Sequence, residues 1–171
     1  MLIREARPQD YEAAGRVTQA AWREFEWPAD PIWAEYFARL GDVAGRAERA
    51  LVLVALERGM VVGTATVELE STVESGGTLE PDHANFRMLA VAPAWRGRGV
   101  GRRLVEECIA RARGVGKSIA TLHTAEEMVA ALAIYGSLGF ERDPAGDYEP
   151  ASGHVLRAYR LELAAVGRAG S

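Results

Sequence analysis

The sequence predicts an α/β fold in which strands and helices follow one another within one domain, and two segments carry this prediction. Residues 51–56 and 61–69 are apolar runs rich in β-branched side chains that meet at Arg58-Gly59, which is typical of a β-hairpin. Residues 86–113 read as an apolar strand, a proline break, a basic glycine-rich turn and a helix with one apolar face. The chain has 171 residues, so we expect a single domain over residues 1–164 and a flexible tail at residues 165–171.

The N-terminal half is expected to form one strand, two helices and the hairpin. Pro8-Gln9-Asp10 combines a proline with an acidic residue, as helix starts do, and Trp27 to Pro31 break the helical pattern again. The expected elements are, in order, a strand at 2–6, helices at 8–25 and 32–40, a glycine- and arginine-rich connection up to residue 50, the hairpin, and a loop at 71–85.

The C-terminal half alternates strands with helices. The expected elements are a strand at 86–91, a helix at 99–113, a strand at 118–124, a helix at 126–138, a short strand at 140–142, a loop with Pro144, Gly146 and Pro150, and a last strand at 154–163. The first of these helices repeats apolar residues every three to five positions, and Cys108 lies on that apolar face. We therefore expect Cys108 to be a packed, inert thiol.

Composition and charge exclude several classes of protein. The net charge is −4 and charged residues make up 26% of the chain, which argues against nucleic acid as a partner. The longest apolar run, residues 50–56, is far shorter than the roughly 20 residues of a membrane helix, and the N-terminus lacks a secretory signal. One cysteine and three histidines, without metal-ligand spacing, predict neither an internal disulfide nor a metal site. We expect a soluble, cytoplasmic protein without a membrane partner.

The turn after the strand at 86–91 has the composition of a phosphate-binding loop. Gly97, Gly99 and Gly101 lack a Cβ, so the backbone can adopt unusual dihedral angles and let an anion approach its N–H groups closely. The first N–H groups of the following helix have no intrahelical partner and lie at the positive end of its dipole. Four arginines add positive charge: Arg96, Arg98, Arg102 and Arg103. The predicted ligand is an anionic phosphate ester.

Two other glycine motifs fit the sequence less well. A dinucleotide-binding turn needs the spacing G-x-G-x-x-G, whereas the glycines here stand at positions 97, 99 and 101. Gly116-Lys117-Ser118 is similar to the end of a P-loop, but the first glycine of that motif would fall on Arg111. Because these residues also leave a helix and enter a strand, we interpret them as a helix C-terminus with a flanking cation.

Two sequence elements together resemble the GNAT superfamily of acyl-CoA-dependent N-acyltransferases. Residues 96–101, Arg-Gly-Arg-Gly-Val-Gly, fit its Gln/Arg-x-x-Gly-x-Gly/Ala signature, and residues 135–140, Tyr-Gly-Ser-Leu-Gly-Phe, fit its downstream Tyr-x-x-x-Gly-Phe element. The resemblance implies a mixed, mostly antiparallel sheet, splayed near its middle, with helices on both faces. It also implies acetyl-CoA as co-substrate without a metal, a small-molecule or peptide amine as acceptor, and it allows a homodimer.

The resemblance assigns roles to particular residues. The backbone of Leu89, Ala90 and Val91 would bind the pantetheine arm, and the turn with its arginines and Val100 would bind the pyrophosphate. Tyr135 would place its hydroxyl near the thioester sulfur. An unperturbed tyrosine pKa near 10 lies above a thiol pKa near 8.5, so full proton transfer to the thiolate would be uphill by roughly 2 kcal/mol. Tyr135 is therefore expected to donate a hydrogen bond to the leaving thiolate.

The amine needs a proton acceptor, and several residues could supply it. An alkyl ammonium with a pKa near 10.4 is neutral in only about one molecule in 2,500 at pH 7, which costs roughly 4 to 5 kcal/mol. The strand before the turn offers Arg87-Met88 where some family members have a carboxylate. The candidates are Glu68, Glu70, His83, His123 or water.

Two further features of the sequence bear on the ligands. Met128 stands seven residues before Tyr135, where many family members have an asparagine that contacts the cofactor arm. The segment from Trp22 to Trp33 interleaves aromatic rings with carboxylates, including Trp27 and Asp30, and suits either a pocket for a cationic amine or simple aromatic packing.

The resulting hypothesis is an acetyl-CoA-dependent N-acetyltransferase working by direct attack of a primary amine, and the alternative is an acyl-CoA-binding module without turnover.

Overall fold

The computed structural model describes residues 1–25, 31–70, 78–151 and 154–163. Its strands are β1 (Leu2–Glu5), β2 (Leu51–Glu57), β3 (Met60–Glu68), β4 (His83–Val91), β5 (Ile119–Thr124), β6 (Glu141–Arg142), β7 (Tyr148–Ala151) and β8 (His154–Glu162). Its α-helices are α1 (Tyr11–Trp22), α2 (Pro31–Gly41), α3 (Val43–Ala47), α4 (Val100–Gly114) and α5 (Val129–Ser137). The expected tail at residues 165–171 lies outside the described residues.

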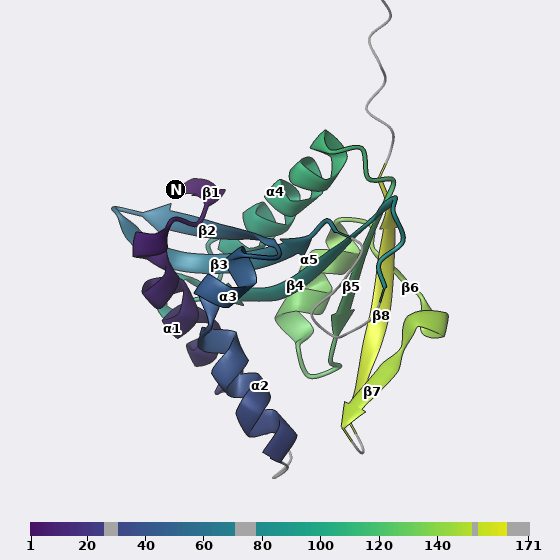
Figure 1. The fold of residues 1–171 in the computed structure, drawn as a ribbon, viewed down its shortest axis with the longest axis horizontal. Helices are drawn as coiled ribbons and strands as arrows, with labels where there is room; N and C mark the ends of the chain where they lie inside the picture. Colours follow the sequence, from purple (N-terminus) through teal and green to yellow (C-terminus); the bar gives the residue numbers. More distant parts are fainter. Residues whose placement is uncertain (26–30, 71–77, 152–153, 164–171) are drawn as a thin grey trace, which may run out of the picture.

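The strands form one mixed sheet in the order β1-β2-β3-β4-β5-β8-β6, and β7 pairs with β8 (Figure 1). The β4–β5 pair is parallel, whereas the other pairs are antiparallel. A parallel pair needs a crossover, and α4 supplies it between β4 and β5. The expected mixed, mostly antiparallel sheet is confirmed.

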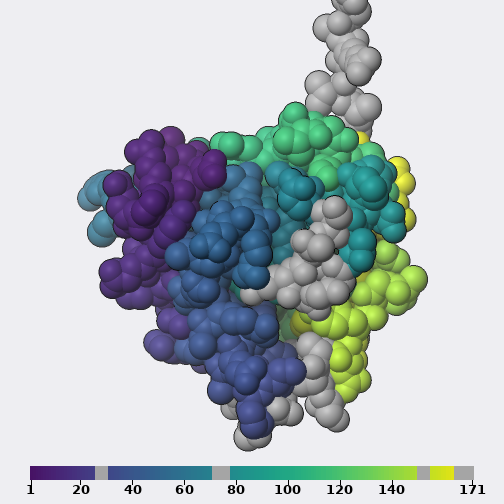
Figure 2. Space-filling model, viewed as in Figure 1, coloured from purple at the N-terminus to yellow at the C-terminus, as the bar shows by residue number. Residues whose placement is uncertain are grey.

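Helices cover both faces of the sheet, as strand β2 shows. Its side chains point alternately to the two faces: Leu53 and Ala55 pack into the cluster of α4 and α5, whereas Val52 and Val54 pack with residues of α1 and α3. In the space-filling view, the purple and blue N-terminal helices cover one part of the front face, and the yellow-green strand β7 lies beside them (Figure 2). A sheet buried on both sides explains why β2 is apolar from Leu51 to Leu56.

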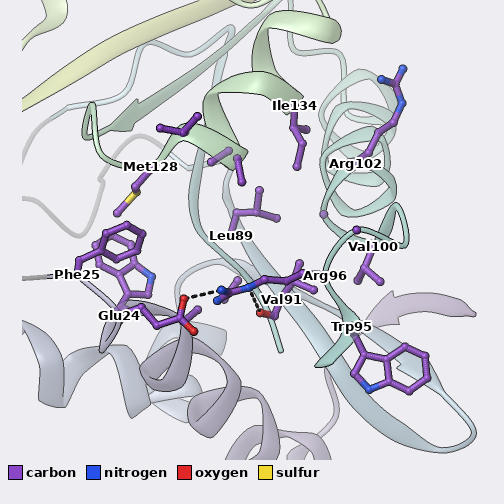
Figure 3. A pocket seen from close by; sticks show the side chains of 18 of the residues that line it. Glu24, Phe25, Leu89, Val91, Trp95, Arg96, Val100, Arg102, Met128 and Ile134 are labelled. Atoms are coloured by element: carbon purple, nitrogen blue, oxygen red, sulfur yellow. Dashed lines mark hydrogen bonds and ion pairs between the residues drawn. The ribbon is translucent and has the colours of Figure 1, made fainter. Parts of the chain in front are cut away.

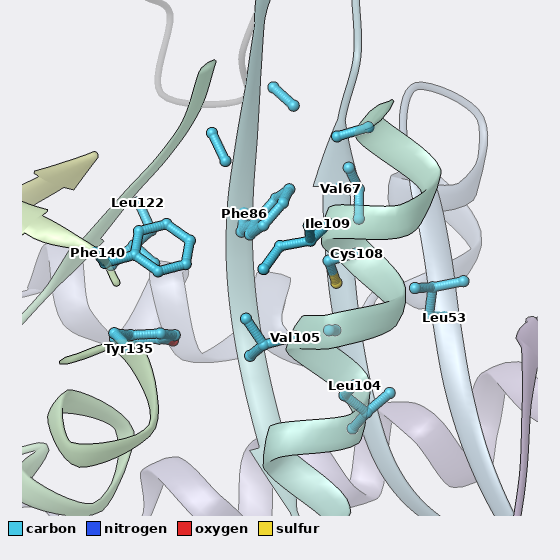
Figure 4. Close-up of a cluster of buried hydrophobic side chains, with 14 of the residues drawn as sticks. Leu53, Val67, Phe86, Leu104, Val105, Cys108, Ile109, Leu122, Tyr135 and Phe140 are labelled. Atoms are coloured by element: carbon cyan, nitrogen blue, oxygen red, sulfur yellow. The ribbon is translucent and has the colours of Figure 1, made fainter. Parts of the chain in front are cut away.

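The largest core cluster lies between α4 and the sheet (Figure 4). Leu104, Val105 and Cys108 from the apolar face of α4 meet Leu53 and Phe86 from the strands. Each large apolar side chain buried in this way contributes on the order of 1.5–3 kcal/mol. Cys108 is 1% exposed, and burial raises the pKa of its thiol far above the usual value. The expectation of a packed thiol is confirmed, and a buried, protonated thiol is a poor nucleophile.

Several boundaries and two elements differ from the sequence-based expectation. The connection up to residue 50 contains α3, because the Asp42 carboxylate caps it by accepting a hydrogen bond from the Gly45 N–H at 2.9 Å. The expected loop at 143–153 contains β7, which is a strand only through its pairing with β8. The expected loop at 71–85 ends early, because β4 begins at residue 83, where it joins β5. The first helix ends at residue 22 and α5 begins at residue 129, each three residues short of the expectation.

A β-bulge in β4 and a split between β4 and β5 shape the middle of the sheet. Thr64 lies opposite Ala90 and Thr66 opposite Arg87, so one residue of β3 faces two of β4, and Met88 has φ +53°. Phe86 therefore packs toward α4, whereas Ala90 packs toward α1. The β4–β5 pairing ends at Phe86. Beyond this residue, the edge of β4 that faces β5 is open, as expected for a splayed sheet.

None of the helices in the described ranges has the length and apolarity of a membrane-spanning segment. Within the same ranges, no cluster of three histidine, cysteine, aspartate or glutamate side chains is arranged to hold a metal ion.

Candidate functional site

The glycine-rich turn exposes the N-terminus of α4. Gly97 and Gly99 have φ values of +70° and +75°, in the left-handed region that favours glycine. Gly99 is the N-cap, so no side chain caps the helix there. The Arg103 N–H is the first to bond within the helix, to the Gly99 carbonyl at 3.0 Å. The N–H groups of the preceding residues have no helical carbonyl to bond and are available to an anion.

A pocket of about 520 Å³ opens at this helix terminus (Figure 3). Its walls are the end of β4, the start of α4, the start of α5 and the end of α1. Because α1 and α4 cover opposite faces of the sheet, the pocket passes the open edge of β4. The lining residues are Ala21, Trp22, Glu24, Phe25, Leu89, Ala90, Val91, Trp95, Arg96, Gly97, Gly99, Val100, Gly101, Arg102, Glu127, Met128, Val129, Ala130, Ala131 and Ile134.

The pocket brings together nine of the eleven residues expected to bind the cofactor. It unites the β4 segment, residues 89–91, with the turn and the first helical residues, whereas Arg98 and Arg103 are not among its lining residues. The Arg98 guanidinium lies over the Trp95 ring, 4.9 Å from its centroid. The Arg103 guanidinium lies 3.5 Å from the Met1 carbonyl oxygen.

The two arginines that line the pocket are held by different partners. Arg96 Nη1 lies 2.5 Å from a Glu24 carboxylate oxygen, and its Nε donates to the Val91 carbonyl at 3.4 Å (Figure 3). Arg102 turns outward, where its Nε meets Glu106 at 2.9 Å and its Nη1 meets the Ser137 hydroxyl at 2.9 Å. The side chains of both ion pairs are between 42% and 48% exposed, so each pair contributes little to stability and Arg96 can exchange Glu24 for an anion at low cost.

Helix α5 forms an apolar wall that the sequence analysis missed. Met128, Ala131 and Ile134 line the pocket, and the Met128 side chain points toward Phe25 across it (Figure 3). Their spacing of three residues is the spacing of one helical face, which is the signal that would have found them. A Cβ added at Gly101 would stand 3.0 Å from the Ile134 side chain, so glycine lets α5 approach α4 closely.

Tyr135 lies on the other side of α5, in the core, and not among the residues that line the pocket. It is 7% exposed, and its ring centroid lies 5.7 Å from that of Phe140 (Figure 4). Burial, with a smaller contribution from Cys108, raises the pKa of its hydroxyl well above the usual value. The hydroxyl therefore stays protonated and is a hydrogen-bond donor.

The carboxylate candidates for the proton acceptor lie at the end of β3. Glu68 is 5% exposed and accepts hydrogen bonds from Asn85 Nδ2 at 2.6 Å and from Arg87 Nη1 at 3.2 Å. Glu70 is exposed and lies beyond the last residue of the strand. Glu68 is thus occupied by a buried network.

The two histidine candidates lie at opposite ends of the neighbouring parallel strands β4 and β5. His83 begins β4 and its Nδ1 lies 2.8 Å from Asp82 Oδ1. The strand places it about 20 Å from Leu89 at roughly 3.3 Å per residue. His123 lies near the end of β5, and its Nε2 is 2.8 Å from the Gly146 carbonyl oxygen.

The aromatic segment expected to bind the acceptor divides between the pocket and the packing of α1 on α2. Trp22 and Phe25 line the pocket. The Trp22 ring of α1 also meets the Tyr36 ring of α2 edge-on, with centroids 5.6 Å apart, and Trp33, which is 9% exposed, packs edge-on against Tyr36 within α2. Residues 26–30, with Trp27 and Asp30, lie outside the described residues.

Comparison with known sequences points to one family. The profile of the acetyltransferase (GNAT) family matches residues 14–140. An IAA acetyltransferase of Azospirillum brasilense is 32% identical over 99 residues, which are 57% of this chain and 60% of that protein. The chain thus spans less than two thirds of that relative. The L-amino acid N-acyltransferase MnaT of Escherichia coli (strain K12) is 30% identical over 154 residues, which cover 82% of this chain and 79% of MnaT.

Solved structures give the same answer for the fold. A GNAT family acetyltransferase from Brucella melitensis, determined in complex with acetyl-CoA, superimposes with a TM-score of 0.65 at 26% sequence identity, over 94% of this chain and 86% of that one. The profile covers most of the chain, and the alignment with MnaT extends over most of both proteins. The chain therefore belongs to the acetyltransferase (GNAT) family.

Proposed function

We propose that this protein transfers the acetyl group of acetyl-CoA to a primary amine, by direct attack of the amine on the thioester. The observation that carries the proposal is the pocket in which the uncapped start of α4 and the open edge of β4 line one continuous space. The start of α4 can bind an anion, and the open edge of β4 can bind an extended polar chain through backbone hydrogen bonds. The acetyl-CoA complex of the Brucella melitensis relative supports the choice of ligand.

In this proposal, the pyrophosphate of the coenzyme lies against the N–H groups of the turn, from Gly97 to Arg102, and Arg96 adds charge from the side. Arg98 and Arg103 contribute positive potential from the rim. The backbone of residues 89–91 holds the pantetheine arm, and the apolar wall of α5 packs against it. Met128 offers only weak acceptor capacity through its sulfur, which already lies 3.4 Å from the Thr124 hydroxyl, so in this proposal an apolar surface replaces the contact that asparagine makes in many family members.

Tyr135 has the proposed role of hydrogen-bond donor to the leaving thiolate. Its raised pKa supports donation of a hydrogen bond over transfer of the proton, because transfer would require a tyrosinate in a buried site. The hydroxyl would have to turn toward the gap between β4 and β5 when the coenzyme is bound.

The acceptor is proposed to be a small molecule or a peptide with a free amine. The name of the MnaT relative makes free L-amino acids the first class to test. We further propose that residues 1–164 act as one domain. The cytoplasmic location and the homodimer remain predictions.

Two measurements test the activity. Calorimetry with CoA checks binding, and thiol release from acetyl-CoA is followed with a panel of the free L-amino acids and peptides with a free N-terminus. An enzyme releases thiol when an amine is added. A non-catalytic acyl-CoA-binding module binds CoA and releases none, and a protein that gives no heat and no saturation with CoA contradicts both functions.

A further inference from the structure

We propose that His123 Nδ1 accepts the proton of the attacking amine, a role that rests on the acetyltransferase activity proposed above. None of the four side-chain candidates is distinguished by the sequence alone, and the structure separates them by position, orientation and hydrogen bonding.

His123 stands at the point where the sheet splits. The last residue pair between β4 and β5 is Phe86 with Leu122, so His123 is the first residue of β5 that faces the gap. On the other side of the gap, β4 continues to Leu89 and Val91, which line the pocket. Side chains at these two strand ends border the gap, and His123 lies next to the pocket without being one of its lining residues.

The side chain of His123 lies on the polar face of the sheet, opposite α4. Thr121 Oγ1 is 3.3 Å from Asn85 Oδ1, which places Thr121 in the polar network with Glu68. Side chains alternate along a strand, so His123 shares this face with Thr121, whereas Leu122 packs into the core beneath α4. An amine that enters the gap from this face would pass His123.

A backbone carbonyl fixes the protonation of the ring. His123 Nε2 lies 2.8 Å from the Gly146 carbonyl oxygen, which can only accept a hydrogen bond. Nε2 therefore carries the hydrogen in the neutral imidazole, and the lone pair is on Nδ1. This tautomer is the one that leaves Nδ1 able to accept a proton.

The turn that supplies this carbonyl is built rigidly against β8. A Cβ at Gly146 would stand 2.8 Å from the Ala158 Cβ, so only glycine fits there without a shift. The next residue, Asp147, accepts hydrogen bonds from Arg142 Nη1 at 2.7 Å and from the Ala158 N–H at 2.8 Å. The ring of Tyr148 meets that of His123 edge-on, with centroids 4.9 Å apart. The imidazole is therefore oriented from two sides.

The charged and titratable neighbours of His123 come from four strands, β3, β4, β7 and β8. Arg87 and Glu68 lie on the same face and are close enough to Tyr148 for both charges to influence the pKa of its hydroxyl, which burial raises. Arg160 of β8 pairs with Thr121 and thus shares the face. Glu68 is itself committed to Asn85 and Arg87. Among the residues that the structure describes, His123 Nδ1 accepts no hydrogen bond, and unlike Glu70 and His83 it lies where β5 separates from β4.

The reaction step balances as follows. The ammonium gives one proton to His123 Nδ1, and the nitrogen lone pair forms the C–N bond to the thioester carbonyl carbon. The C–S bond then breaks, and its electron pair leaves on sulfur. The second amine proton passes to the thiolate to give CoA as the free thiol. The proton on His123 is lost to solvent, which restores the imidazole.

The test compares His123→Gln with the unchanged protein, using acetyl-CoA and the amine of the panel above that reacts fastest. Glutamine keeps an N–H donor for the Gly146 carbonyl and removes the proton acceptor. We expect kcat/KM for the amine to fall about 100-fold or more at pH 7, with KM for acetyl-CoA unchanged. The difference in kcat/KM between His123→Gln and the unchanged protein should shrink toward high pH, because the amine then loses its proton to water. In His123→Ala, added imidazole should restore part of the rate.

His83→Gln is the matched control, because His83 is a histidine at the far end of β4, paired with Asp82. It should retain the rate of the unchanged protein. Equal rates for His123→Gln and the unchanged protein across the pH range, or an equal deficit at every pH without rescue by imidazole, would overturn the proposal. If the unchanged protein itself released no thiol with any amine, the proposed function would fail instead, so the two failures are distinguishable.

Discussion

Replacing Gly99 by alanine separates the folding role of the turn from its proposed binding role. Gly99 has φ +75°, and a Cβ added there would meet no atom within 4 Å. The folded protein therefore bears only the cost of the left-handed conformation, about 1–2 kcal/mol. For a chain of this size, that corresponds to a fall in Tm of about 2–8 °C.

The effect on the coenzyme should be larger, because the new methyl group would stand in the space through which the pyrophosphate approaches the backbone. Loss of one hydrogen bond to a charged group costs about 1.5–3 kcal/mol, which corresponds to a roughly 10- to 150-fold higher Kd for CoA. Calorimetry gives the Kd, and thermal unfolding without ligand gives the Tm.

Gly116→Ala is the matched control at the other end of α4. Gly116 has φ +81° and also meets nothing within 4 Å, so the backbone cost is similar. The control should lose similar stability and keep the affinity of the unchanged protein for CoA. If both variants bound CoA equally well, the pyrophosphate would not lie against this turn, and the reasoning would be refuted.

Three further predictions concern the core and the turn beside β8. Tyr135→Phe should lower kcat about 10-fold or more with a smaller effect on acetyl-CoA binding; unchanged turnover would leave Tyr135 as a core residue only. The Arg142 guanidinium, together with the Ala158 N–H, lowers the pKa of Asp147 to about 2. The ionised Asp147 carboxylate therefore stabilises the fold above its usual pKa near 4, and this stabilisation is lost as the pH falls toward 2. The free energy of unfolding of Asp147→Asn, measured with urea, should depend less on pH between these two values than that of the unchanged protein. Leu104→Ala should reduce the free energy of unfolding by about 2–5 kcal/mol, because Leu104 is 0% exposed in the main core; a loss below 1 kcal/mol in urea titrations would contradict this packing.

Elements governed by local patterns were predicted well. The hairpin of β2 and β3 and the helix α4 appear close to their expected bounds, because alternation and helical spacing are carried by neighbouring residues. The strand β7 and the first residues of β4 were missed, since their pairing partners, β8 and β5, lie elsewhere in the chain. The bulge at Met88 was also missed, because a non-glycine residue adopts a positive φ only where the surrounding sheet holds it there.

The sequence by itself determined the turn and the start of α4, because Gly97 and Gly99 permit dihedral angles that other residues resist, and a helix that follows such a turn leaves its first N–H groups unbonded. Tertiary structure decided which side chains face the pocket. The bulge in β4 reverses the face of Ala90, the packing of α5 turns Tyr135 into the core, and the Gly146 carbonyl orients His123. These outcomes depend on contacts between segments far apart in the chain, which no local pattern of residues specifies.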